Sequence, residues 1–212
     1  MKILTATLVV DGTSDRTLLP VVQFLLDEWS PWPHRILFAE GLHNGPLTTR
    51  LPRALQLYPC DLLFIHRDAE AAPATNRQEE IEAAAKQIKK PPSHICLIPV
   101  RMTESWLLLD QHAIRTAAGN PQGTVALQLP PAKAVEKLVD PKAKLFEALI
   151  AASDRTGRRK RQFKPEAARH RVAELMDLSN LRAIPSFAHA ESQVKEYFAN
   201  HGTRTALQNA AN

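Results

Sequence analysis

A short, unbroken apolar run near the middle of the first half constrains the fold of this chain more than any other feature. Residues 62–65 are all apolar, and they lead directly into the polar segment 66–70. A solidly apolar run of this length is typical of a strand that is buried on both faces, as in a parallel sheet covered by helices. Ligands in such sheets bind just beyond the carboxyl ends of the strands, which is where Asp68 and Glu70 fall. The run therefore predicts a buried parallel strand with two acids at its functional end.

Further apolar runs alternate with segments of helical periodicity, a pattern that predicts an α/β fold with a four-stranded, mainly parallel sheet and helices on both faces. Pro20 predicts that the first helix kinks or starts late. Thr103 is expected to cap the fourth helix, and Pro91-Pro92 to stop the third. The expected strands cover residues 3–10, 35–39, 61–66 and 94–100, and the expected helices cover 18–29, 47–58, 78–90 and 104–118.

The second part of the chain gives only helical signals. Four helices are expected, and each has a proline near its first turn, where the missing amide proton costs nothing. We therefore predict two units: a domain over residues 1–120, and an all-helical, basic C-terminal region over 121–212 that is packed on the domain or appended to it. The four expected helices cover residues 131–139, 141–152, 165–177 and 185–200.

Positive charge is concentrated in one part of the chain. The net charge is +5, but residues 141–171 alone carry ten Lys or Arg against three acids, which leaves the remainder slightly acidic. The cationic segment, residues 155–164, holds six of these cations around Phe163, and Gly157 indicates a mobile loop. Such a segment is typical of nucleic-acid binding, although a solvated loop or a dock for an acidic protein remains open. The six candidate nucleic-acid-binding residues are Arg155, Arg158, Arg159, Lys160, Arg161 and Lys164.

Acids follow three of the expected strands. Because the carboxyl ends of parallel strands share one edge of the sheet, acids that are far apart in sequence are expected to converge there. Adjacent carboxylates repel each other unless a cation or a proton neutralises them, and carboxylate oxygens are the ligands that Mg²⁺ and Mn²⁺ prefer. The sequence therefore predicts a divalent-metal site, with candidate ligands Asp11, Asp15, Asp68, Glu70 and Glu104.

Each of these acids also has a structural interpretation. Asp11 can belong to a turn with Gly12, Asp15 can be a helix-start acid, and Glu104 can pair with Arg101. His66 and Arg67 can contact a phosphate, or they can pair with the acids at the end of the strand. Asp110 lies on a different face of the expected helix from Glu104, which favours a structural role for Asp110. Trp106 is expected in the core, and Phe163 is expected to anchor its segment rather than stack on a base.

Three motifs resemble those of Toprim domains, the fold of topoisomerase and primase cores and of OLD-type nucleases. Residues 9–19, with Asp11 and Asp15, are similar to the first Toprim motif, and residues 64–70 fall where the second acidic motif stands. Residues 100–110, with Glu104, resemble a motif of uncharacterised bacterial Toprim-like proteins that are often encoded beside AAA- or ABC-type ATPases in phage-defence cassettes. The resemblance covers residues 3–119.

The resemblance implies a Mg²⁺- or Mn²⁺-dependent nuclease acting on phosphodiesters, with Asp11, Asp68, Glu70 and Glu104 as catalytic residues. Two departures from the family pattern favour an alternative. Asp11 stands where the family has Glu, and the second motif is D-x-E rather than D-x-D, so the oxygens are displaced by about 1 Å. The alternative is a non-catalytic Toprim-like subunit that docks on a partner AAA- or ABC-type ATPase.

The apolar N-terminal run is too short to span a membrane and has no small-residue cleavage site, so we expect a cytoplasmic protein with no membrane partner. Cys60 and Cys96 lie in or beside apolar runs without metal-finger spacing, which predicts free thiols.

Overall fold

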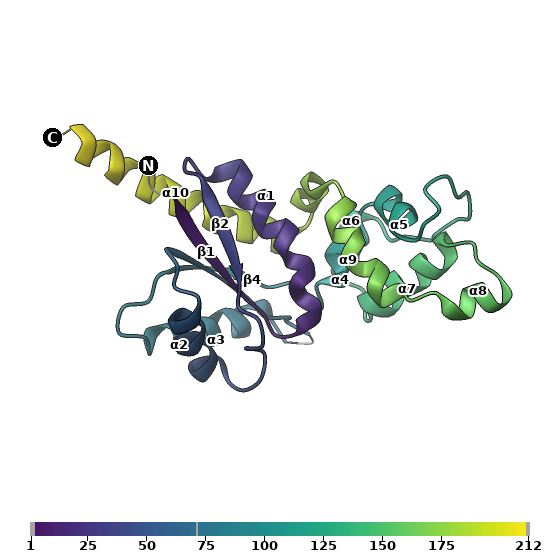
Figure 1. Ribbon diagram of the computed structural model, residues 1–212, viewed down its shortest axis with the longest axis horizontal. Coiled ribbons are helices and arrows are strands. Elements are labelled where there is room, and N and C mark those ends of the chain that lie inside the picture. Colours follow the sequence, from purple (N-terminus) through teal and green to yellow (C-terminus); the bar gives the residue numbers. More distant parts are fainter. Residues whose placement is uncertain (1–2, 71, 211–212) are drawn as a thin grey trace.

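The sheet has four strands, and all of its pairings are parallel. The computed structural model describes residues 3–70 and 72–210, with side chains as far as residue 201. The strands are β1 (Leu4–Val9), β2 (His34–Phe38), β3 (Leu62–His66) and β4 (Ser93–Leu97), in the spatial order β2-β1-β3-β4 (Figure 1). Every residue of β1 and β3 is buried, as the unbroken apolar runs predict for central strands. The chain therefore has an α/β fold of Rossmann-like type.

Helices cover both faces of the sheet and divide the apolar side chains into two cores. On one face α2 (Leu47–Leu57) and α3 (Ala74–Lys86) pack over the smaller core. On the other face α1 (Leu19–Trp29) and α10 (Pro185–Ala210) lie over the larger core (Figure 1). The 3₁₀ helix η1 (Thr13–Leu18) precedes α1, which explains how Pro20 is accommodated: it falls in the first turn of α1.

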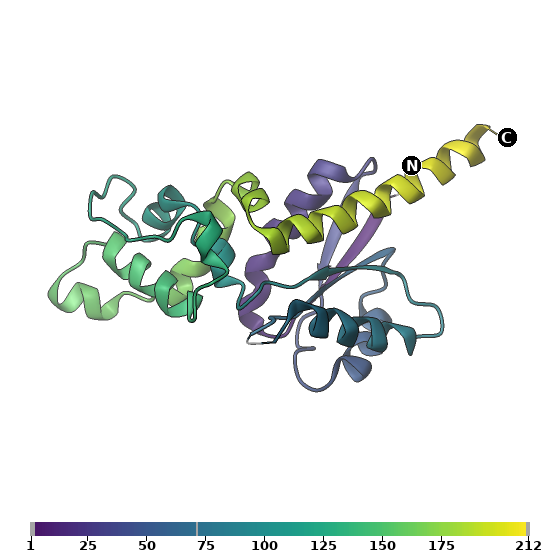
Figure 2. The ribbon, with the colours of Figure 1, turned by 180° about the vertical axis from the view of Figure 1, so that it is seen from behind.

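The chain leaves the sheet after β4 and forms a helical lobe, residues 104–183, before returning (Figure 2). The larger core continues from the sheet into this lobe, so residues on both sides of the expected boundary at residue 120 share one core. The division into two units stays a prediction. The elements of the lobe are α4 (Glu104–Leu107), α5 (Gln111–Ala117), α6 (Ala132–Val135), α7 (Pro141–Ala152), α8 (Gly157–Gln162), α9 (Pro165–Leu175) and η2 (Leu178–Ala183).

Helix α10 brings the chain back from the lobe to the open edge of β4 (Figure 2). The amide oxygen of Gln193 accepts a hydrogen bond from the Cys96 backbone N–H at 2.9 Å, and its amide nitrogen donates to the Cys96 carbonyl at 3.4 Å. The side chain thus occupies backbone groups that would otherwise be available to another strand. Cys96 and Cys60 are both free thiols, as predicted.

Five local expectations are wrong. The helix expected over 131–139 is only the single turn α6 (Ala132–Val135). Helix α3 begins and ends four residues earlier than expected, because it starts directly after Pro73 and the residues before Pro91 leave the helix. The expected helix over 104–118 is divided into α4 and α5. Asp110 interrupts it, because its carboxylate accepts a hydrogen bond from the Ala113 N–H and so caps the start of α5. Thr103 makes no side-chain cap. The cationic segment contains helix α8 rather than only a loop.

Within the part of the chain that the structure describes, no helix combines the length and the apolar character needed to cross a bilayer.

Candidate functional site

The strand order places a natural ligand-binding position between β1 and β3. The connections lead from β1 outward to β2 on one side and then back across to β3 on the other, so the direction of winding reverses at the β1–β3 pair. Ligands of open α/β sheets bind outside the carboxyl ends of the strands at such a switch point. Asp11 follows β1 and Asp68 follows β3, and these two residues therefore flank the position where a ligand is expected.

Both carboxylate oxygens of Asp11 face arginines. Oδ1 accepts a hydrogen bond from Arg50 Nη1 at 3.0 Å, and Oδ2 lies 2.8 Å from Arg67 Nε. Arg50 is 4% exposed and also donates from Nε to the Leu42 carbonyl at 2.7 Å and from Nη2 to the Val10 carbonyl. Arg67 continues the network through Nη1, which donates to Glu80 at 2.6 Å. Asp11 is thus a charge partner that holds α2 and the end of β3 against the end of β1.

Arg50 was not among the residues that the sequence analysis singled out, although the sequence contains a signal for it. It lies on the same face of α2 as Leu47, Leu51 and Ala54, all of which are buried. An arginine at a core position of an amphipathic helix must be paired, because burial of an uncompensated charge costs several kcal/mol.

Asp15 and Asp68 meet around a fully buried histidine. His66 Nε2 lies 3.6 Å from Asp15 Oδ2, 3.4 Å from Asp68 Oδ1 and 3.4 Å from Thr103 Oγ1. The other ring nitrogen, Nδ1, lies 3.0 Å from the Leu97 carbonyl, which can only accept, so Nδ1 carries a proton. The two carboxylates are therefore brought together on the remaining nitrogen of the ring.

Backbone groups fix the orientation of both carboxylates. Asp15 Oδ2 accepts from the Gly12 N–H at 2.8 Å, and Asp68 Oδ1 accepts from the Thr103 N–H at 3.1 Å. The second bond joins the ends of β3 and β4, because Thr103 belongs to the segment between β4 and α4, and the contact of Asp15 with His66 adds the end of β1. Of the acids expected to converge from three segments, Asp15 and Asp68, from two of these segments, thus lie around one histidine.

Burial raises the pKa of Asp68 to about 6. The charge on His66 opposes this shift, whereas the carboxylates of Asp15, Glu104 and Asp11 add to it because like charges disfavour ionisation. These three acids are therefore close enough to act on Asp68. We call the group Asp11, Asp15, His66, Asp68 and Glu104 the acid edge.

Glu104 is buried and points to the helical lobe. Its Oε1 accepts a hydrogen bond from Arg169 Nη1 at 2.5 Å, and both residues are less than 10% exposed. The partner is thus Arg169 on α9 and not Arg101, the partner that the structural interpretation of Glu104 offered. The pair connects the acid edge to the C-terminal helices, which no local sequence pattern indicates.

Glu70 lies apart from the other candidates. It has a left-handed backbone conformation with φ of 55°, its side chain is 68% exposed, and its Oε2 faces Arg77 Nη2 at 3.4 Å. Although Glu70 is only two residues from Asp68, the charges that act on the pKa of Asp68 come from other segments.

The acid edge in this arrangement does not fit the metal site that the sequence predicts. Among the side chains of residues 3–70 and 72–201, no group of three or more His, Cys, Asp or Glu is placed to hold a metal ion. Asp11, Glu70 and Glu104 are each paired with arginine, so a cation would have to displace a like charge to reach them. The assignment of the five acids as metal ligands stays a prediction.

The cationic segment lies at the end of the helical lobe that is farthest from the sheet (Figures 1 and 2). All six of its cations are exposed, and within the described residues none of them forms an ion pair. Arg155 stacks over the Phe163 ring at 5.0 Å, and Phe163 packs against the larger core. Phe163 therefore anchors the segment, as expected.

Comparison of this chain with protein-family models, with curated proteins and with solved structures gave no match.

Proposed function

We propose that this protein is a non-catalytic, Toprim-like nucleic-acid-binding subunit whose contact surface is the cationic segment. One observation carries the proposal: six exposed cations within ten residues have no acidic partner among the described side chains. Lys and Arg that neutralise phosphates release condensed counterions, which gives affinity for any nucleic-acid sequence. The acid edge in this proposal is a structural charge network that fastens the lobe to the sheet.

Helix α8 makes the cations a formed surface rather than a disordered run. Residues 158–161 occupy successive positions of α8 and distribute four charges around it, while the Arg155–Phe163 stack fixes the two ends of the segment. A ready-formed helix loses less conformational freedom when it binds than a loop does. This arrangement suits contacts to phosphates and provides no base-reading motif, so we expect binding without sequence preference.

The test is a salt titration of binding. Fluorescence anisotropy with labelled duplex DNA and duplex RNA should give an affinity that falls steeply between 50 and 200 mM salt. The α8 variant, in which Arg158, Arg159, Lys160 and Arg161 are replaced with alanine, should bind on the order of a hundredfold more weakly and reduce the slope of log affinity against log salt by about 3 to 4. Equal binding by this variant would refute the proposal.

A matched control separates the segment from net charge alone. Arg53, Lys86, Lys89 and Lys90 are also exposed, and their replacement with alanine removes the same charge from the sheet domain. We expect this control variant to keep the affinity within about threefold of the wild type, because general steering is a smaller effect than direct phosphate contact. A loss as large as that of the α8 variant would assign binding to the overall charge instead.

A second candidate is the metal-dependent phosphodiester hydrolysis that the Toprim resemblance implies. The observation in its favour is the convergence of Asp15, Asp68, Glu104 and Asp11, which act together on the pKa of Asp68. Cleavage of plasmid DNA or RNA in Mn²⁺ that is lost in Asp68→Asn would support hydrolysis. If the wild type neither cleaves in Mn²⁺ nor shows Mn²⁺ binding by calorimetry, hydrolysis is refuted and the non-catalytic proposal stands.

The resemblance also implies an AAA- or ABC-type ATPase as a partner of the non-catalytic subunit. If an AAA- or ABC-type ATPase is encoded beside this chain, its co-purification, compared between the wild type and the α8 variant, tests whether the cationic segment serves nucleic acid or that partner. Loss of the ATPase with retention of nucleic-acid binding would assign the segment to the protein partner.

A further inference from the structure

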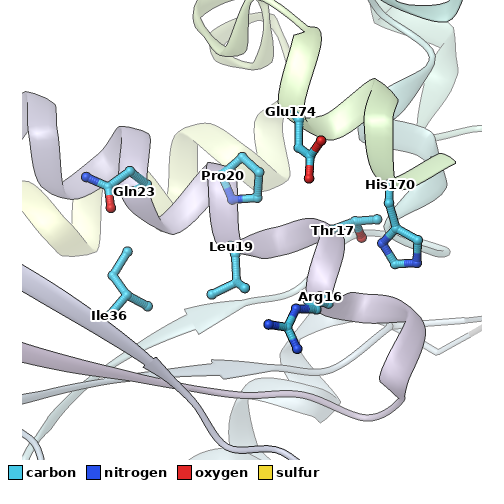
Figure 3. Close-up of a pocket in the computed structure, with 8 residues that line it drawn as sticks. All are labelled: Arg16, Thr17, Leu19, Pro20, Gln23, Ile36, His170 and Glu174. Atoms are coloured by element: carbon cyan, nitrogen blue, oxygen red, sulfur yellow. The ribbon is translucent and has the colours of Figure 1, made fainter. Parts of the chain in front are cut away.

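A cavity of about 450 Å³ lies between η1, the start of α1, β2 and α9 (Figure 3). It forms because β2 is the less covered edge of the sheet: no residue of β2 is buried, whereas β1 beside it is buried throughout. Its volume lies within the range of small-molecule sites, which commonly occur where two parts of a fold meet. The acid edge does not use this cavity, and the cationic segment is remote from it.

The side chains that line the cavity change in character along its length (Figure 3). Ile36 lies at one end, Leu19 and Pro20 follow, and the three present half-buried apolar surface. His170 lies at the other end, and the carboxylate of Glu174 points between these two ends. The Arg16 guanidinium lies beside Leu19, turned away from His170, and stacks over the Phe38 ring at 5.3 Å. The site thus offers apolar side chains, one carboxylate acceptor, and nitrogen donors on either side of that acceptor.

We propose that this cavity binds a nucleoside monophosphate. The base packs on the shelf of Leu19, Pro20 and Ile36, because flat apolar faces of this kind accept a planar ring. The ribose hydroxyls donate to the Glu174 carboxylate, the kind of contact that acids make with ribose in other α/β folds. The phosphate is held by the Arg16 guanidinium and the His170 imidazole.

The electrostatics of the polar end agree with this assignment. Arg16 has one carboxylate contact, to Glu40 at 3.6 Å, and both side chains are more than half exposed, so the pair is weak and a phosphate can compete for the guanidinium. Burial lowers the pKa of His170, and the charge on Arg169 lowers it further. A neutral imidazole still donates one hydrogen bond to a phosphate oxygen, and its second nitrogen can accept from water.

The experiment is isothermal titration of the full chain with adenosine 5′-monophosphate, adenosine and ribose 5-phosphate. We expect saturable binding of the monophosphate and at least tenfold weaker binding of each fragment, because each lacks one end of the ligand. Adenosine or ribose 5-phosphate binding as tightly as the monophosphate would overturn the proposal. No saturation by the monophosphate at millimolar concentration would overturn it as well.

Two variants test the two ends of the cavity. Arg16→Ala removes the guanidinium and should weaken monophosphate binding about tenfold or more, since a charged hydrogen bond to phosphate is lost. Ile36→Trp fills the apolar shelf and should block the base while it leaves the secondary structure, measured by circular dichroism, unchanged. Unaltered binding by both variants would place the ligand elsewhere.

Arg53→Ala is the matched control for Arg16→Ala, because Arg53 is exposed on α2 and does not line the cavity. The α8 variant should bind the monophosphate like the wild type, since the cationic segment is not part of the cavity. Failure of monophosphate binding and failure of nucleic-acid binding are therefore separate outcomes.

Discussion

The acid edge and the cationic segment show how one chain can use charge for two different purposes. At the acid edge the carboxylates of Asp11 and Glu104 are paired with buried arginines, and those of Asp15 and Asp68 flank a fully buried histidine. In the cationic segment every charge is exposed and no acid among the described residues compensates it. The charges of the acid edge hold parts of the fold together, whereas the charges of the cationic segment are available to bind another molecule.

The difference follows from where each set of charges lies. The acids stand at the ends of buried strands, where they are largely shielded from water and an unpaired buried charge costs several kcal/mol. The cations stand on or beside a short helix whose residues are all exposed, where water and mobile ions already screen them. Mutations at the acid edge should therefore change stability, and mutations in the cationic segment should change binding.

The largest effect on stability is expected from breaking the Glu104–Arg169 pair. Arg169→Met leaves Glu104 buried without its partner and should lower the free energy of unfolding by about 3 to 5 kcal/mol in urea titrations. The double variant Glu104→Leu with Arg169→Met removes both charges and should recover most of this loss. Arg171→Met, at an exposed position of the same helix, is the control and should change stability by less than about 0.5 kcal/mol.

If Arg169→Met is as mild as its control, the acid edge does not fasten the helical lobe, and the contrast between the two regions fails. If the double variant is as unstable as the single one, the loss comes from packing of the arginine side chain rather than from the orphaned carboxylate.

A smaller, pH-dependent effect is expected at Asp68. Because its pKa is raised from 3.8 to about 6, the folded state holds this proton more tightly than the unfolded state. The contribution of Asp68 to stability is therefore present below about pH 4, falls as the pH rises to about 6, and is absent above that.

Asp68→Asn keeps the acceptor for the Thr103 N–H but does not titrate. Urea unfolding at several pH values should show this variant gaining stability relative to the wild type as the pH rises from 4 to 7, by up to about 3 kcal/mol. A difference that is constant with pH, or that changes in the opposite direction, would contradict the burial of Asp68 among like charges.

The sequence predicts the sheet well because strands that are buried on both faces appear in the sequence as unbroken apolar runs. The apolar runs at β1 and β3 have no other plausible role, and prolines mark the starts of α7, α9 and α10. Boundaries that depend on one capping residue are harder. Asp110 reads as a residue of a continuous helix until its carboxylate is seen to accept from Ala113 and from the Asp177 backbone.

The convergence of the acids was predictable, and so was the interpretation of His66 and Arg67 as residues that satisfy them, but the partners from other elements were not. The carboxyl ends of parallel strands must share an edge, and this rule brings Asp15 and Asp68 together. The arginines that neutralise Asp11 and Glu104 lie on α2, directly after β3 and on α9, and the approach of Arg50 and Arg169 depends on how α2 and α9 pack. A metal site and an arginine-paired network therefore have the same appearance in the sequence, because both require clustered carboxylates.

The smallest effect on stability is expected for the variant that matters most for binding. Replacing Arg158, Arg159, Lys160 and Arg161 with alanine removes no ion pair among the described residues, and alanine is the best helix former, so the free energy of unfolding should stay within about 0.5 kcal/mol. Because the four like charges repel at low salt, the wild type should gain a few tenths of a kcal/mol between 50 and 500 mM NaCl that the variant does not gain. A loss above about 1 kcal/mol would show that these cations support the fold, and the distinction between the two regions would then disappear.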